Sequence, residues 1–72
     1  LEGIDDTEPE DVAAVYHNLG GVAHARGDPH AAEPYARRAV EVRSAAYGPD
    51  HPDTLLDRSA HAAILDAIGR FE

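Results

Sequence analysis

The stretch that decides the fold is ARGDPHAAE at residues 25–33, and AIGRFE at residues 67–72 repeats its pattern. In each, a glycine interrupts a helical pattern, and these glycines, Gly27 and Gly69, lie 42 residues apart. A fixed period of this size is typical of helical repeats that stack on one another. The sequence therefore predicts an all-α fold that works by presenting a surface.

The composition limits the size and setting of the domain. Seventy-two residues form at most one small domain, near the size at which a single core is only marginally stabilising. No apolar run approaches the ~18 residues of a membrane-spanning helix, and there is no basic-then-apolar signal region. Cysteine is absent, which excludes thiol chemistry and fits a cytoplasmic location. Because the chain starts at Leu1, we expect a piece of a longer protein.

The charge balance is strongly acidic, with fourteen Asp and Glu residues against six Arg and a formal net charge of −8. Nucleic acids and anionic membrane surfaces attract clustered cations, so both are disfavoured as partners. A basic peptide would be attracted, although acidity also simply keeps a small protein in solution.

Three helices are predicted, at about residues 10–26, 30–47 and 53–68. Gly27 is expected to end the first in a left-handed C-cap, with Asp28 capping the second. The adjacent Gly20 and Gly21 weaken an isolated helix by roughly 1 kcal/mol each, but would let a neighbouring helix approach closely. Gly69 is expected to end the third helix, so that Phe71 and Glu72 would point toward a fourth.

Periodicity also predicts which side chains are buried. The inner face of the first helix is predicted as Val12, Val15, Tyr16, Leu19, Val22, Ala23 and Arg26. That of the second is Ala32, Tyr35, Ala36, Ala39, Val40, Arg43 and Tyr47, with Glu33 among the residues facing water. The third helix offers Leu55, Ala62, Ile64, Leu65 and Ile68.

Three stretches, NLG at 18–20, AEPYARRAVEV at 32–42 and GPDHPDT at 48–54, resemble the tetratricopeptide repeat. More narrowly, they are similar to the 42-residue kinesin-light-chain-like variety found in many bacterial proteins. The resemblance covers about residues 9–72. It implies antiparallel helix–turn–helix pairs stacked into a right-handed α-solenoid, with the first helix of each pair lining a concave groove. Arg58 and His61 stand where large apolar residues are expected, so the second repeat is imperfect.

The resemblance also implies a domain organisation. Residues 9–47 would form a complete helix pair, 48–54 a linker, and 55–72 the first helix of an incomplete second repeat. Residues 1–8 are either an acidic leader or the end of a preceding repeat.

Carried over residue by residue, the resemblance places a partner-binding groove on the first and third helices. Its residues would be Ala14, His17, Asn18, Gly21, His24, Leu56, Ser59, Ala63 and Asp66. In the family, the asparagine matched by Asn18 can bond an extended peptide, because a side-chain amide offers both donors and an acceptor. Alternatively, Asn18 only ties one helix to the next.

Two functional classes follow. The first is a scaffold that binds a peptide or protein in this groove. The second is a self-association module, because a repeat buries its apolar faces only by stacking on neighbours. An uncovered face on the third helix would then make the isolated chain a dimer or higher oligomer. That face is predicted as Leu55, Ile64, Leu65, Ile68 and Phe71.

Metal binding and catalysis are not expected. His17 and His24 are seven residues apart, about 10 Å along a helix, which is too far to share an ion unaided. His61 is predicted to be a hydrogen-bonded core histidine. Ser44 and Ser59 lie mid-helix, outside any nucleophile-elbow context, and no glycine cluster forms a phosphate-binding loop. We therefore expect a protein that is not an enzyme, with no metal and no cofactor.

Overall fold

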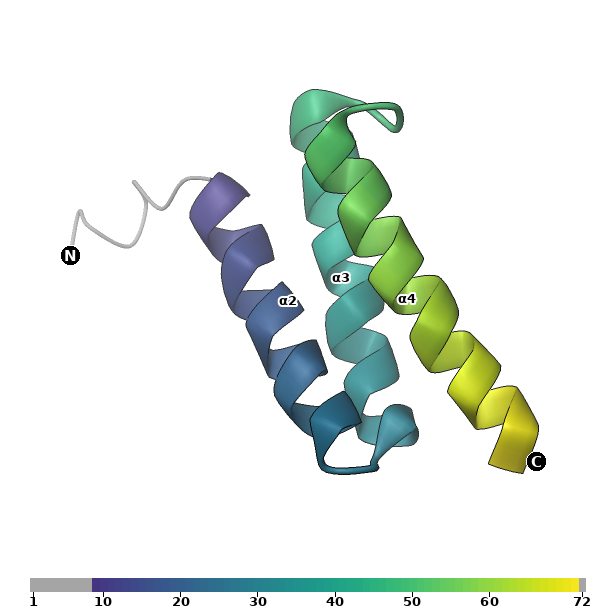
Figure 1. The fold of residues 1–72 in the computed structure, drawn as a ribbon. Helices are drawn as coiled ribbons and strands as arrows, with labels where there is room; N and C mark the ends of the chain where they lie inside the picture. Colours follow the sequence, from purple (N-terminus) through teal and green to yellow (C-terminus); the bar gives the residue numbers. More distant parts are fainter. Residues whose placement is uncertain (1–8, 72) are drawn as a thin grey trace, which may run out of the picture.

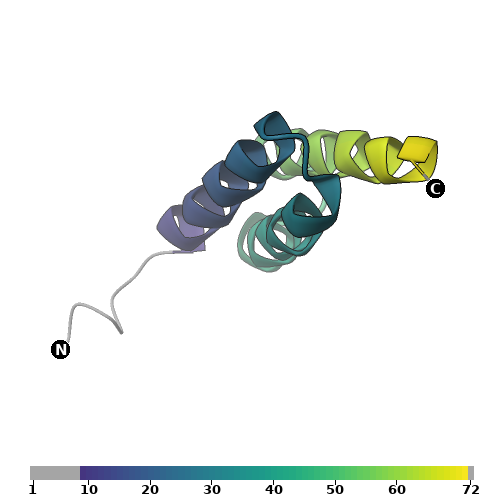
Figure 2. The same cartoon turned by 90° about the horizontal axis from the view of Figure 1, so that it is seen from below.

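The computed structural model describes residues 9–71, apart from the side chains of Pro9 and Phe71. They form three helices, α2 (Pro9–Ala25), α3 (Pro29–Tyr47) and α4 (Pro52–Phe71). As Figures 1 and 2 show, α2 and α3 form an antiparallel hairpin, and α4 runs back along α3. Helix α3 contacts both of the others and is the centre of the fold. The all-α prediction is confirmed, with helix starts within about one residue of those expected.

The turn between α2 and α3 is built as its sequence predicts. Gly27 has a φ of 81°, in the left-handed region. Its N–H donates to the carbonyl of His24, and the N–H of Asp28 donates to that of Ala23, both at 3.0 Å, which is the Schellman pattern of a helix C-terminus. The Oδ1 of Asp28 then accepts from the N–H of Ala31 at 3.2 Å and caps α3. One short segment therefore ends one helix and starts the next.

Small residues allow α2 and α3 to pack closely. Ala32, Ala36 and Ala39 of α3 are buried, as is Ala13 of α2. A Cβ at Gly20 would lie 3.4 Å from backbone atoms of α3, so the missing side chain lets the two helices approach closely there, as expected. At Gly21 a Cβ would meet nothing within 4 Å, and this second glycine instead faces open space.

The predicted inner face of α2 is partly wrong. Val15, Leu19 and Val22 are 55%, 43% and 52% exposed. Helix α2 carries apolar residues on two faces, and the face of small residues packs on α3 because it permits the closer contact. We call the exposed apolar surface formed by Val15, Leu19, Val22 and Tyr35 the α2 outer face. The predicted burial of Tyr35 and Tyr47 is also wrong, since both rings are exposed.

Tyr16 and Tyr47 nevertheless help to join α2 to α3. The rings of Tyr16 and Tyr35 stack with centroids 6.4 Å apart. The hydroxyl of Tyr47 donates to Oε1 of Glu10 at 3.2 Å, which ties the end of α3 to the start of α2. Partial desolvation, followed by this hydrogen bond, raises the pKa of Tyr47 above its ordinary value.

The inner face of α4 is half polar, which the periodicity of apolar residues did not predict. Thr54, Asp57 and Ile64 are buried at i, i+3 and i+10, while Leu55, Ala62 and Leu65 are exposed. The predicted burial of these last three is therefore wrong. The predicted self-association face also needs correction, because Ile64 is buried in the core and Ile68 packs against it. Leu55 and Leu65 remain uncovered, and the side chain of Phe71 lies outside the described residues.

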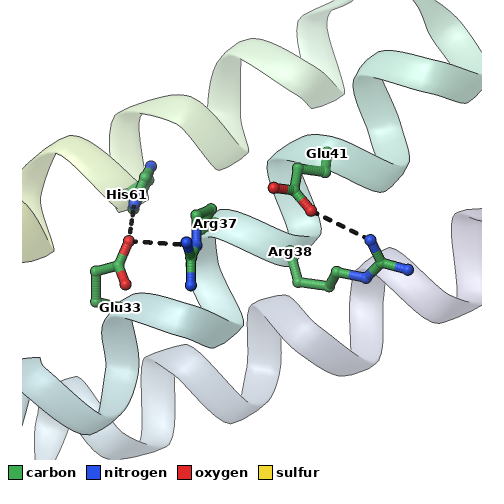
Figure 3. A network of polar contacts seen from close by, with 5 residues as sticks. All are labelled: Glu33, Arg37, Arg38, Glu41 and His61. Atoms are coloured by element: carbon green, nitrogen blue, oxygen red, sulfur yellow. Dashed lines mark hydrogen bonds and ion pairs between the residues drawn. The ribbon is translucent and has the colours of Figure 1, made fainter.

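A polar network joins α3 to α4 on the surface (Figure 3). The Nε2 of His61 is 2.9 Å from Oε2 of Glu33, and because an ionised carboxylate only accepts, the histidine donates. The same carboxylate oxygen lies 3.6 Å from Nε of Arg37. The hydrogen bond predicted for His61 is confirmed, but its predicted place in the core is wrong, because the side chain is 20% exposed beside Glu33. The prediction that Glu33 faces water is wrong, because the carboxylate is drawn against α4 by His61.

The two glycines that define the 42-residue period have different structural roles. Helix α4 continues through Gly69 to Phe71, so the predicted helix end at Gly69 is wrong. Gly69 does not have a positive φ, whereas Gly27 does. A C-cap needs the following chain to turn away and bond the last carbonyls, and AIGRFE lacks the Asp-Pro that follows Gly27.

Alanine substitutions at these glycines are therefore expected to have opposite effects. Gly27→Ala should lower the free energy of unfolding by about 1 kcal/mol, because an alanine resists the left-handed conformation. Gly69→Ala should raise it by about 0.5 kcal/mol, since a Cβ there meets nothing within 4 Å and alanine favours a helix. Urea unfolding followed by circular dichroism measures both. Equal losses of stability would mean that Gly69 is also a helix end.

Candidate binding groove

A cavity of about 100 Å³ lies between α2 and α4, with α3 as its floor. Its lining consists of His17, Gly20, Gly21 and His24 from α2, Ala36 and Ala39 from α3, and Asp57, Ala60, Ala63 and Ile64 from α4. The α2 residues recur at i, i+3, i+4 and i+7, so they form a single helix face. Most of the lining is apolar, and the polar side chains are His17, His24 and Asp57.

The structure brings together part of the predicted groove. Among the nine predicted residues, His17, Gly21, His24 and Ala63 line the cavity. The other five, Ala14, Asn18, Leu56, Ser59 and Asp66, lie outside its lining, and all except the half-buried Ala14 are exposed. Their part in binding stays a prediction.

The difference has a geometric cause. Adding 42 to each groove position of the first helix assumes that α2 and α4 present equivalent faces to a partner. The side of α4 that turns toward α2 instead carries Asp57, Ala60 and Ile64. This side lies about one residue, or roughly 100°, around the helix from Leu56 and Ser59. The cavity lies between α2 and α4, so it is lined by a different side of each of these helices.

Sequence reasoning missed Asp57, which is the most buried charged residue of the described part of the chain. Its side chain is 2% exposed. The Oδ1 of Asp57 lies 2.9 Å from Nδ1 of His17 on α2, and its Oδ2 lies 3.0 Å from Nε of Arg43 on α3. Arg43 is itself mostly buried and also lies 3.4 Å from the exposed carboxylate of Asp53. A buried carboxylate needs polar or charged partners, and Asp57 of α4 has one on each of the other two helices, His17 on α2 and Arg43 on α3.

A signal for this centre was present in the sequence. Arg43 falls on the predicted inner face of its helix, and a guanidinium placed there requires an acidic partner. Asp57 stands seven residues before Ile64, on the same side of the third helix. Charged residues at buried positions of two predicted helices would have indicated an ion pair between them.

Some buried polar atoms at and near this centre have no hydrogen-bond partner. Among the described residues, the buried atoms without a hydrogen-bond partner are Nε of Arg43, Oδ2 of Asp57 and Oγ1 of Thr54. The Arg43–Asp57 contact is therefore an electrostatic pair whose geometry falls short of a hydrogen bond. Such a centre contributes less stability than apolar packing of the same volume, but losing one partner leaves the other charge buried.

Two other kinds of site, a metal centre and a membrane-spanning segment, have no counterpart within residues 9–71. In this range, no three His, Asp or Glu side chains are grouped so that they could hold a metal ion. None of the helices described is both long and apolar enough to cross a membrane. A second, more open depression lies along the α2 outer face, where Leu19, Val22 and Tyr35 are among its lining.

Comparisons with known proteins agree with this architecture. Residues 11–72 match the tetratricopeptide repeat family. The chain is 32% identical over 69 residues to a clustered mitochondria protein homolog of Ajellomyces capsulatus, and 35% identical over 66 residues to that of Coccidioides immitis. These matches cover 96% and 92% of the chain but 5% of each relative, so the chain spans about one-twentieth of their length. No solved structure matches it. The helical hairpin followed by an antiparallel third helix, together with the family match over most of its length, shows that this chain belongs to the tetratricopeptide repeat family.

Proposed function

We propose that the chain is a non-catalytic protein–protein interaction module, part of a repeat scaffold that binds a peptide or protein between α2 and α4. The observation that carries this proposal is the open cavity between these helices, where Gly21 leaves space for a partner. The protein interactions for which the family is known support it. The lining offers apolar contact with a few polar side chains, which suits recognition of a side chain.

Finer assignments belong to the same proposal. The linker GPDHPDT supports the kinesin-light-chain-like variety and the organisation into a pair at 9–47, a linker at 48–54 and a first helix at 55–72. Helix α4 begins at Pro52, inside this linker. The net charge of −8 favours a peptide or protein partner over nucleic acid or an anionic membrane, and a cytoplasmic location accords with the lack of cysteine.

Selection from a phage-displayed library of random 12-residue peptides tests the groove. Peptides enriched on the wild-type chain are expected to bind the Gly21→Leu variant at least tenfold more weakly, because leucine would occupy the cavity. The same variant should unfold at a higher temperature, since leucine replaces glycine within a helix at a gain of up to about 1 kcal/mol. Binding and stability therefore move in opposite directions, which separates lost recognition from lost folding.

Two further variants test His24, which lines the cavity, and Asn18, which lies outside its lining and is assigned to the groove by the family resemblance alone. Asn18→Ala and His24→Ala are expected to weaken peptide binding with no decrease in melting temperature, because both side chains are exposed. Arg58→Ala, an exposed change outside the cavity lining, is the control and should leave binding unchanged. If Gly21→Leu binds the selected peptides as tightly as the wild type, the cavity is not the binding site.

A second candidate function is self-association. Leu55 and Leu65 of α4 are about half exposed, and the α2 outer face adds a second apolar surface. Apolar surfaces that stay exposed on a folded chain are commonly covered by another protein surface. A second copy of the chain would cover them, and a dimer or higher oligomer is then expected.

Light scattering across a concentration series measures this association. Leu65→Lys and Leu19→Lys place a charge on either apolar surface, and the variant that returns the chain to a monomer identifies the surface in contact. A folded wild-type monomer at millimolar concentration would exclude self-association as the function.

A further inference from the structure

We propose that His17, held in place by Asp57, is a hydrogen-bond acceptor in the groove. Its partner is an uncharged N–H or O–H donor attached to a small apolar group. A hydroxyl or amide N–H of the partner would supply that donor. The inference rests on the proposed function, because it names the chemistry by which the same groove recognises its partner.

The contact with Asp57 determines which ring nitrogen is available. Nδ1 of His17 lies 2.9 Å from Oδ1 of Asp57. Without a proton on Nδ1, two lone pairs would face each other at this distance, so Nδ1 carries a proton. In a neutral imidazole the other nitrogen, Nε2, then accepts. The ring is 38% exposed and lines the cavity, and no side chain among the described residues bonds its Nε2.

The charges around the cavity favour a neutral donor. Asp57, which supplies the carboxylate of the cavity lining, is buried and lies 3.0 Å from the guanidinium of Arg43, so its charge is already compensated and is not left to attract an ammonium group. The lining contributed by α3 is alanine alone, and α4 adds Ala60, Ala63 and Ile64. A charged group would lose its hydration against these apolar side chains without gaining an equal partner.

The size of the cavity limits the partner group. At about 100 Å³ it is smaller than the ~150 Å³ cavity that accommodates benzene in an engineered protein core. A group of roughly three to five heavy atoms therefore fits. A serine or threonine side chain, or a backbone amide beside a small side chain, is small enough for the cavity and also supplies an uncharged hydrogen-bond donor.

The tautomer of His17 provides a test that needs no partner. Long-range ¹H–¹⁵N spectra of the wild-type chain at pH 7.5 report which ring nitrogen is protonated. We expect a protonated Nδ1 and a bare Nε2 at His17. A proton on Nε2, in either the opposite tautomer or the doubly protonated ring, would overturn the assignment of an acceptor.

Three probes of nearly equal shape test the chemistry of the donor. Isopropanol donates a hydrogen bond, acetone only accepts, and isopropylammonium donates but is charged. In NMR titrations, isopropanol is expected to move the Nε2 signal of His17 and the amide of Gly21 saturably, with an affinity roughly threefold to tenfold above that of acetone. The signals of His30 and His51, which lie outside the cavity lining, serve as internal controls.

Each outcome decides the inference. Equal affinities for isopropanol and acetone would show apolar filling alone, and preference for isopropylammonium would show a cation site; both overturn it. His17→Phe should reduce isopropanol affinity to that of acetone. If isopropanol binds as expected while no displayed peptide is selected, the acceptor stands and the proposed peptide-binding function fails.

Discussion

Asp57→Asn is expected to lower the free energy of unfolding by about 3 kcal/mol, the largest loss we predict for a single residue. The substitution preserves the volume of the side chain and removes its charge, so Arg43 stays mostly buried without its main partner. Breaking one side of a buried pair typically costs about 3–5 kcal/mol. The lower end applies because Arg43 retains Asp53 at 3.4 Å. A single core of this size rarely supplies more than about 3–5 kcal/mol in total, so the variant should keep at most about 2 kcal/mol and be partly unfolded in buffer.

Asp53→Asn is the matched control for this prediction. Asp53 also pairs with Arg43, but its carboxylate is half exposed, and exposed pairs contribute less than about 1 kcal/mol. Circular dichroism during titration with urea measures the control. Titration with trimethylamine N-oxide, which favours the folded state, measures Asp57→Asn if it is unfolded in buffer. Equal losses of unfolding free energy in the two variants would show that the burial of Asp57 does not make its pair with Arg43 more important for stability than the exposed pair with Asp53.

Ile64→Ala is expected to lower the free energy of unfolding by about 2–3 kcal/mol. Ile64 is 2% exposed and packs against Ala32 and Ala36, so it is the bulkiest side chain of a core otherwise made of alanine. Truncating a buried isoleucine to alanine typically costs about 2–5 kcal/mol, and the cost is lower where neighbours can close the cavity. The lower part of this range applies, because α4 contacts mainly α3 and few other contacts oppose its moving inward to close the cavity.

The adjacent Leu65 provides the control on the same helix. It is 48% exposed, and Leu65→Ala should cost less than about 1 kcal/mol in a monomer. Thermal unfolding of both variants at two protein concentrations separates packing within the chain from packing between copies. A loss at Leu65 that matches the loss at Ile64 and grows with concentration would mean that a second copy covers this surface.

The local elements of the fold were predictable because their determinants act within one helical turn. Gly27 supplies the left-handed backbone, Asp28 caps α3 with its own carboxylate, and Gly48 ends α3 with a φ of 96°. Each of these signals depends on a few neighbouring residues, so the helix limits could be predicted from the sequence. The exception, Gly69, shows that a glycine ends a helix only when the residues after it also favour a turn.

The buried side of each helix was harder to predict, because α2 carries apolar residues on two sides and the buried side of α4 is partly polar. Val15, Leu19 and Val22 follow the spacing of a buried stripe yet remain exposed, since the small residues of α2 pack on α3 instead. On α4 the predicted burial of Ile64 is confirmed and Ile68 packs against the core, but the buried side also includes the polar Thr54 and Asp57, which a pattern of apolar residues does not predict. Because a different side of α4 faces α2 from the one predicted, part of the groove also lies away from its predicted positions.

The sequence by itself determined three helices, their turns and membership of a repeat family, because caps, turn residues and linker motifs are local chemistry. Only the tertiary structure decided which side of each helix is buried, and it placed His17, Arg43 and Asp57 around one centre. These residues lie on three helices and share no short motif, so the helical pattern could indicate an Arg43–Asp57 pair but not that His17 joins it. Their association depends on how each helix is rotated against α3, and that rotation is set by close packing of small residues and by the need to pair a buried charge.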